Sequence, residues 1–375
     1  MSFEKRLTES GIAIRRNLEG MRCTIPAVLL ALVLLVTGDK NLVAQEAQTA
    51  AEATSPAEPE RLVIVVRGAS GTSEYGRLFD SWCDRWRDAA DRGNANFIRI
   101  GSAAPGPVAA AKPSDRDLLK TTFNDFAETS DGLGGAELWV VLVGHGTFDG
   151  RTARFNLRGP DVTADELASW LEAVSCPIVI ANCASASAPF LKPLAGPNRV
   201  VMTATKSGAE VNFARLGEYL SQAIGDASFD LDKDGQTSLF EAYLSASRRT
   251  QEFYDSEGRL ATEHALLDDN GDGQGVRANL FRGVRQVGKV KGNAVVDGRL
   301  AHQFHLVRSD VEQKLSPQAR RTRDQLEQAV IELRDRKSTF ANEDAYYAQL
   351  EPLLIQLATF YAAGEQEPDQ PELTK

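Results

Sequence analysis

A histidine and a cysteine in this chain each follow a short apolar run and stand among small residues. His145 lies in Gly-His-Gly after residues 138–143, and Cys183 lies in Asn-Cys-Ala after residues 177–181. A cysteine thiolate is a strong nucleophile, and a histidine can protonate a leaving group. The pair predicts nucleophilic catalysis, with the backbone N–H groups of Gly146 and Cys183 as an oxyanion hole. A structural interpretation stays open, because free cysteine is among the most buried residue types.

The elements around these residues decide whether they can meet. Both apolar runs have the length and Val/Ile content of buried parallel strands. Strand-like and helix-like segments alternate along the chain: we predict strands at 62–66, 96–101, 138–143, 177–181 and 199–204, and helices at 75–92, 115–129 and 163–174. This alternation predicts an α/β fold with a mainly parallel sheet and helices on both faces. Ligands and catalytic groups gather at the carboxyl ends of such strands.

An acidic stretch downstream has the spacing of a calcium-binding loop. Residues 230–241 carry Asp at positions 1, 3 and 5, Gly at 6, Ser at 9 and Glu at 12, which is the EF-hand pattern. The flanking segments 216–223 and 239–253 have helical periodicity. The predicted Ca²⁺ ligands are Asp230, Asp232, Asp234, the backbone carbonyl of Gln236, Ser238 and Glu241. A solvated acidic turn is the alternative interpretation.

A second acidic run begins in the same way. Positions 1, 3 and 5 of the pattern are Asp268, Asn270 and Asp272. Position 12, where the closing glutamate would be, is Asn279. These residues are candidate metal ligands as a half-site or as oxygen donors to the first ion. A solvated turn fits them as well.

The N-terminal stretch has the features of an export signal. Residues 25–36 are apolar over about a dozen positions, shorter than the roughly 20 that a membrane span needs. We predict a signal peptide at 1–44, with Met21 as a candidate true start, and a disordered spacer at 45–60. The protein is then secreted or periplasmic and free of the membrane after cleavage; an uncleaved anchor is the alternative. The net charge of −10 argues against a nucleic-acid partner.

The C-terminal part has apolar residues at helical spacing and no pattern of catalytic residues. Residues 309–362 are predicted to form an antiparallel helical hairpin that packs on the protein or binds a protein partner, and 363–375 to fray. The remaining chain, 61–308, is then one domain that carries the helix-loop-helix at 216–253. His302 and His305 have no local acid or cysteine in register and are interpreted as structural.

The two strand ends resemble those of the caspase-like cysteine peptidases, and within them the legumain family. VLVGHG at 141–146 is similar to the family's apolar strand ending in His-Gly. IVIANCASA at 178–186 is similar to its strand ending in Ala-Cys, followed closely by Ser-Gly. GASG at 68–71, followed by Tyr75, is similar to the legumain start. The resemblance covers about residues 61–223.

The resemblance implies a caspase-like three-layer sandwich that cleaves a peptide or protein substrate. It implies His145 and Cys183 as the catalytic pair and Gly146 as an oxyanion donor. Residues at the corresponding specificity site would bind substrate: Arg67, Ser185, Lys206, Ser207 and Glu210.

Three positions depart from the family pattern: Asn182 before the cysteine, Ala186 after the serine, and Gly76 where a pocket arginine would stand. The sequence therefore predicts an exported cysteine endopeptidase with a structural calcium ion. A catalytically inactive, calcium-stabilised peptide- or protein-binding module is the alternative.

Overall fold

The computed structural model describes residues 61–101, 113–133, 135–288 and 297–364. All of these belong to one structural unit, Glu58–Lys375. The predicted signal peptide at 1–44, the spacer at 45–60 and nearly all of the tail at 363–375 lie outside the described residues.

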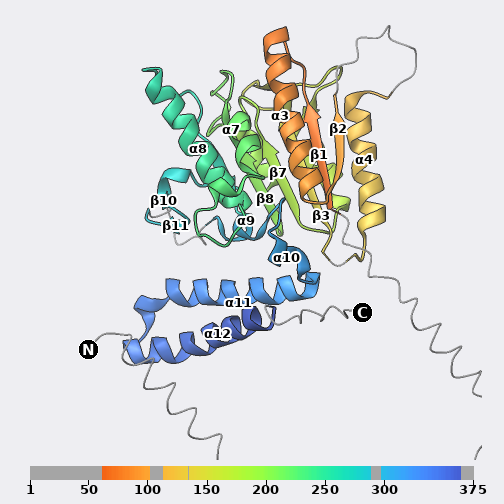
Figure 1. Cartoon of the computed structure of the whole chain (residues 1–375). Coiled ribbons are helices and arrows are strands. Elements are labelled where there is room, and N and C mark those ends of the chain that lie inside the picture. Colours follow the sequence, from red (N-terminus) through yellow and green to blue (C-terminus); the bar gives the residue numbers. More distant parts are fainter. Residues whose placement is uncertain (1–60, 102–112, 134, 289–296, 365–375) are drawn as a thin grey trace, which may run out of the picture. The chain divides into compact units, whose positions relative to one another are not determined.

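Six strands form the central sheet, and five of them are parallel (Figure 1). Their order across the sheet is β2-β1-β3-β7-β8-β9, and only the edge strand β9 runs antiparallel to its neighbour. The strands are β1 (Arg61–Arg67), β2 (Asn96–Ile100), β3 (Glu137–Val143), β7 (Ile178–Asn182), β8 (Arg199–Thr203) and β9 (Leu266–Asp268). The predicted mainly parallel sheet is confirmed, because the central strands are apolar on both faces and are buried between helices.

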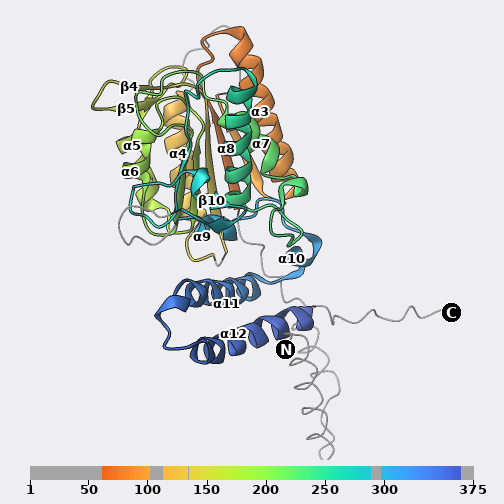
Figure 2. The same ribbon diagram turned by 90° about the vertical axis from the view of Figure 1, so that its left-hand side faces the viewer.

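Helices cover both faces of the sheet, as Figures 1 and 2 show. On one face lie α3 (Ser73–Arg92), α7 (Leu216–Ala223) and α8 (Leu239–Ser256), which share a core cluster with Val63 and Val65. On the other lie α4 (Asp115–Ser130), α5 (Ala164–Trp170) and α6 (Leu191–Leu194), with Ile64 and Val66. Successive β1 residues thus point to opposite cores, as a strand requires.

The predicted helix starts coincide with capping side chains. The Ser114 hydroxyl accepts from Asp117 N at the start of α4, and Thr163 and Glu166 form the predicted capping box of α5. The end of α5 differs from the prediction: the α-helix stops at Trp170, and a 3-10 turn, Leu171–Ala173, completes the connection to β7.

Short strands account for most of the unpredicted structure. A three-stranded ribbon follows His145 directly, and a two-stranded one lies near residue 284. They are β4 (Gly146–Phe148), β5 (Ala153–Phe155), β6 (Val162–Thr163), β10 (Phe281–Arg282) and β11 (Arg285–Gln286). Two or three residues are too few for an alternation signal.

Four helices end the described chain: α9 (Arg299–Gln303), α10 (Asp310–Lys314), α11 (Pro317–Asp335) and α12 (Glu343–Gly364). The first arm of the predicted hairpin is interrupted, because Ser316 caps a new helix whose first residue is proline. Helices α11 and α12 pack through Val330, Leu333, Tyr346 and Leu350. In the part of the chain that is described, no helix is long and apolar enough to cross a bilayer.

Candidate functional site

The two predicted catalytic residues follow neighbouring strands at the same edge of the sheet. Strands β3 and β7 pair with Leu142 opposite Asn182, and Cys183 N donates to Leu142 O at 2.9 Å. His145 follows β3 by two residues, so both side chains belong to the carboxyl edge. Among the described residues, no hydrogen bond joins His145 to Cys183.

Cys183 is buried in the core on the α3 and α7 side. Its side chain is 1% exposed, and its thiol lies 3.9 Å from Ala181 O. Helix α7 packs so closely here that a Cβ on Gly217 would lie 2.8 Å from Cys183 Cβ and 2.9 Å from the Trp82 ring. Burial, and then the negative charge of Glu263, raises the pKa of the Cys183 thiol to about 12. The described conformation therefore holds a neutral, enclosed thiol.

His145 is half-buried in an aromatic cage. Its Nε2 lies 3.2 Å from the carbonyl oxygen of Ser70, so this nitrogen carries a proton and donates it. Its ring meets Tyr75 and Phe79 edge-on, each at a centroid distance of 5.3 Å, and Phe213 at 6.3 Å. These contacts fix the imidazole and leave Nδ1 as the ring nitrogen that could act as a base.

The predicted oxyanion donor already has a partner. Gly146 N donates to Ser185 Oγ at 3.3 Å, and the same hydroxyl donates to Gly146 O at 3.2 Å. A Cβ on Gly146 would lie 2.3 Å from Ser185 O, so only glycine fits beside this loop. Ser185, predicted to bind substrate, is 3% exposed and instead joins the two strand-end segments.

The remaining predicted substrate-binding residues divide into buried and exposed groups. Arg67 is buried, with Nε 2.7 Å from Asp80 Oδ1, and supports the start of α3. Glu210 accepts from Lys206 N at 2.8 Å. Lys206 is exposed and Ser207 half-buried, so these two could meet a ligand.

Glu210 also orients a histidine that the sequence analysis did not single out. His264 Nδ1 lies 2.5 Å from Glu210 Oε1, and His264 N donates to Glu210 Oε2 at 3.2 Å. In the described chain, His264 Nε2 has no hydrogen-bond partner. Carboxylate pairing of this kind fixes an imidazole and directs its second nitrogen outward.

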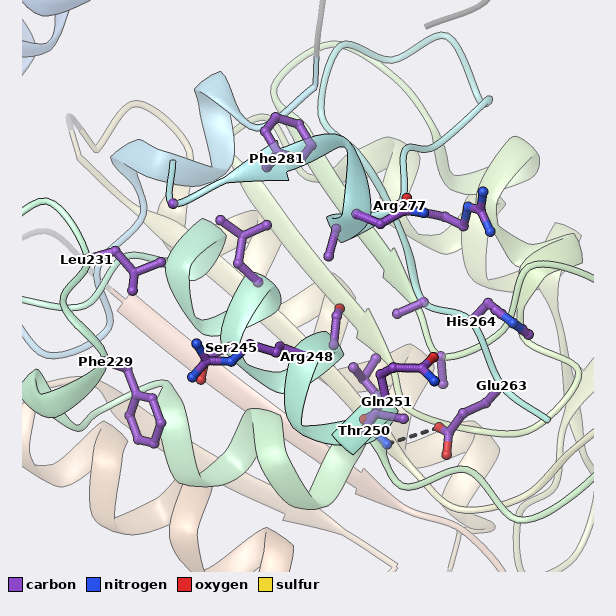
Figure 3. Close-up of a pocket in the computed structure, with 18 of the residues that line it drawn as sticks. Phe229, Leu231, Ser245, Arg248, Thr250, Gln251, Glu263, His264, Arg277 and Phe281 are labelled. Atoms are coloured by element: carbon purple, nitrogen blue, oxygen red, sulfur yellow. Dashed lines mark hydrogen bonds between the residues drawn. The ribbon is translucent and has the colours of Figure 1, made fainter. Parts of the chain in front are cut away.

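A pocket of about 660 Å³ lies beside His264, between α8 and residues 263–283 (Figure 3). Its lining includes Ala204, just beyond β8, so one end of the pocket reaches the carboxyl edge. Buried hydroxyls of Ser245 and Thr250 line it, and neither has a hydrogen-bond partner within the described chain. Both hydroxyl oxygens are enclosed by protein, whereas Gln251 of the lining is exposed and His264 is half-buried.

Glu263 closes the inner wall of this pocket. It accepts from Arg215 N at 2.8 Å and Leu216 N at 3.1 Å at the start of α7, and from the Tyr254 hydroxyl at 3.1 Å. Burial raises the pKa of the Glu263 carboxyl to about 7. In the sequence, Glu263 is marked as a candidate only by its position next to His264, and no helical or strand periodicity surrounds the pair.

The predicted calcium loop folds around its own carboxylates. Asp230 Oδ2 accepts from Gly235 N at 3.0 Å, and Asp232 Oδ1 accepts from Asp234 N at 3.3 Å. One oxygen from each of these three aspartates lies within 4.8 Å of the others. Gly235 has φ of +92°, which favours glycine at this turn. Burial, and then the charge of Asp232, raises the pKa of Asp234 to about 6.

The other predicted ligands of this loop are partly engaged. Glu241 Oε2 accepts from Ser238 N and Oγ, both at 2.8 Å, and Ser238 Oγ caps α8 by accepting from Glu241 N. Glu241 Oε1 accepts from Leu231 N at 2.7 Å. The Gln236 side chain accepts from Ser309 N at 3.1 Å. The oxygen donor set would suit Ca²⁺, and Glu241 would have to give up backbone partners to bind the ion.

The second acidic run forms a similar turn. Asp268 Oδ1 accepts from Gly271 N at 2.9 Å, and Asn270 Oδ1 accepts from Asp272 N at 2.8 Å. Asp268 is fully buried, and its Oδ2 has no hydrogen-bond partner among the described residues. The side chains of this run thus accept from backbone N–H groups of their own turn.

Comparison with known proteins supplies no family assignment. No family model matches the chain, and no curated protein matches it. Twenty-one chains of solved structures show similarity, among them the crystal structure of the Drosophila initiator caspase Dronc. That match has a TM-score of 0.35 and 13% sequence identity, and covers 59% of this chain and 83% of the caspase chain. At this level the likeness concerns the path of the chain, and it transfers no residue role.

Proposed function

We propose that this chain is a caspase-like protein that binds a peptide or protein segment at the carboxyl edge of its sheet without cleaving it. The burial of Cys183 carries the proposal. A nucleophilic cysteine needs access to a carbonyl carbon and a lowered thiol pKa. Cys183 is 1% exposed, and its thiol pKa is raised to about 12.

The surroundings of Cys183 support this choice. Burial and then the charges of Glu263 and Cys83 raise the pKa of the Cys183 thiol, and this disfavours a thiolate. Gly146 N, which would stabilise an oxyanion, donates to Ser185 instead. Asn182, the residue before the cysteine, is buried and holds Ala184 N through its side chain at 3.1 Å.

The pocket beside β8 supports binding. It is about 660 Å³ in volume, within the usual range for ligand sites, and combines apolar walls with polar side chains. Leu244 and Phe281 offer apolar contact. His264 and Gln251, which are labelled in Figure 3, offer hydrogen bonds. An extended peptide could place one side chain in this pocket.

A cysteine endopeptidase is the second candidate, favoured by the register of β3 and β7. Cys183 would attack the peptide carbonyl, His145 would protonate the leaving amine, and water would hydrolyse the thioester. This requires α7 to separate from Trp82, because Gly217 closes the space over Cys183.

A thiol-reactive peptidyl probe separates the two candidates. We expect equal labelling of the wild type and Cys183→Ala, with no turnover of a peptide library. Peptides selected for binding should lose affinity in His264→Ala. Labelling that depends on Cys183 would overturn the non-catalytic proposal and establish the endopeptidase. The substitution is informative because Cys83 and Cys176 supply the same background in both proteins.

We also propose that the 230–241 loop binds Ca²⁺ and that the protein is exported. The clustered aspartate oxygens support the first proposal. The apolar run at 25–36 is the support for the second. Only the sequence resemblance supports legumain-type specificity.

A further inference from the structure

Two histidines from a distant segment lie against the acidic loop. His302, on α9, has Nε2 3.0 Å from Asp232 Oδ2, and His305 Nε2 lies 3.8 Å from Asp234 Oδ2. His302, Asp232 and Glu241 each present a ligand atom, and these three atoms lie within 4.8 Å of one another. The fold therefore adds nitrogen donors to a loop whose own donors are oxygens.

One of the two ring nitrogens that face the loop has no hydrogen-bond partner. Nε2 of His302 is paired with Asp232, whereas Nε2 of His305 is buried and has no hydrogen-bond partner among the described residues. His305 is 6% exposed, so water does not replace the missing partner freely. A buried polar atom without a partner is unfavourable, and a bound cation would remove that cost.

The second acidic run holds these histidines in place. Asp269 accepts from Gly298 N at 2.9 Å and from Ala301 N at 2.8 Å, which ties the first turn of α9 to the sheet edge. Gly298 has φ of +104°, and a Cβ there would lie 2.7 Å from the Phe240 ring. The start of α9 is thus fixed by contacts with α8 and Asp269, and His302 follows one turn later.

The donor set determines the class of metal. Ca²⁺ takes oxygen ligands, whereas imidazole nitrogen together with carboxylate oxygen suits Zn²⁺ and other divalent transition metals. We infer that His302, Asp232 and Glu241 form a transition-metal site, with His305 beside Asp234 as a further nitrogen donor. The inference shares two carboxylates with the proposed calcium site, so the two metals would compete. It does not depend on Cys183.

Metal titrations of the purified, chelator-stripped full chain test the inference. Zn²⁺ and Ca²⁺ are titrated separately by calorimetry into the wild type, His302→Ala and His264→Ala, the last being a matched histidine in the Glu210 pair. We expect one Zn²⁺ per chain in the wild type. His302→Ala should weaken Zn²⁺ binding by at least about tenfold and leave Ca²⁺ binding within a few-fold of wild type. His264→Ala should leave both unchanged.

Cobalt supplies a second readout. Co²⁺ bound through His302 should show visible absorption bands that differ between the wild type and His302→Gln, a variant that keeps a polar side chain if alanine impairs folding. Unchanged Zn²⁺ affinity in both His302 variants, or absent Zn²⁺ binding in the wild type, would overturn the inference. Ca²⁺ binding without Zn²⁺ binding would leave the calcium proposal standing alone. Zn²⁺ binding without Ca²⁺ binding would remove only the calcium proposal.

Discussion

At the carboxyl edge of the sheet, polar groups bond to one another, whereas in the acidic loop like charges face one another. Ser185 satisfies both backbone groups of Gly146. By contrast, the oxygens of Asp230, Asp232 and Asp234 converge within 4.8 Å. A motif that resembles a catalytic centre is thus closed by hydrogen bonds, whereas the acidic loop holds three carboxylates close together. Charge distinguishes the two regions, because burial and backbone hydrogen bonds occur in both: Asp230 and Glu241 are buried and accept from backbone N–H groups.

The largest change in stability should come from removing a side chain that helps to enclose Cys183. Trp82→Ala removes a fully buried ring that packs against Gly217, and should lower the free energy of unfolding by about 3–5 kcal/mol. It should also make Cys183 react faster with a thiol reagent, after subtraction of the background in Cys183→Ala. Trp86→Ala is the matched control, since Trp86 is equally buried on α3 and packs against Trp139. Equal reactivity of Cys183 in both variants would show that Trp82 is not its cover.

The acidic loop should respond to cation instead. At about 100 times its Kd, Ca²⁺ should raise the free energy of unfolding by about 3 kcal/mol. Asp230→Ala combined with Glu241→Ala should abolish that rise, measured as the change in Tm on adding calcium. The exposed pair Asp88→Ala and Glu257→Ala controls for net charge. A rise that survives in the loop variant would mean that calcium binds elsewhere.

Glu263 is a buried acid in the wall of the pocket, and its charge acts on Cys183. Its folded pKa of about 7 lies above the usual 4.5, so the stability that its protonated form supplies is present below pH 4.5 and lost as pH rises through 7. Relative to Glu263→Gln, the wild type should lose roughly 3 kcal/mol between pH 4.5 and 8. Denaturant unfolding of both proteins across this range measures the difference. Parallel pH profiles would show that Glu263 ionises normally.

The smallest effect concerns the hydroxyl that joins the two strand ends. Ser185→Ala leaves Gly146 N and O without this partner and should lower the free energy of unfolding by about 1–2 kcal/mol. Ser207→Ala, at a half-buried position, should change it by less than about 0.5 kcal/mol. Denaturant titration compares them. If the two variants are equally stable, the Ser185 bridge contributes little.

The central sheet could be predicted because its signal is local. Strands β1, β3, β7 and β8 are apolar runs bounded by small or polar residues, and the predicted bounds differ from the observed ones by one residue or so. Edge strand β9 was missed: it has three residues and depends on pairing with β8, more than sixty positions earlier. Such pairing leaves no periodic pattern in its own segment.

The candidate site could be predicted only in part. The residue types and the strand ends that carry His145 and Cys183 follow from the sequence. The roles of Glu210 and His264 could not, because 54 positions separate two residues that form one pair. Likewise, His302 appeared structural since its acidic neighbours come from the distant 230–241 loop.

Neighbours along the chain specify which groups follow each strand and which oxygens share the acidic loop, because a strand run and a twelve-residue loop are local patterns. Packing between distant segments encloses Cys183, because Gly217 of α7 lies against both Cys183 and the Trp82 ring. Accessibility and thiol pKa depend on what packs against a residue from elsewhere. That packing closes the cysteine and brings His302 to the loop, and neither result is present in the local sequence.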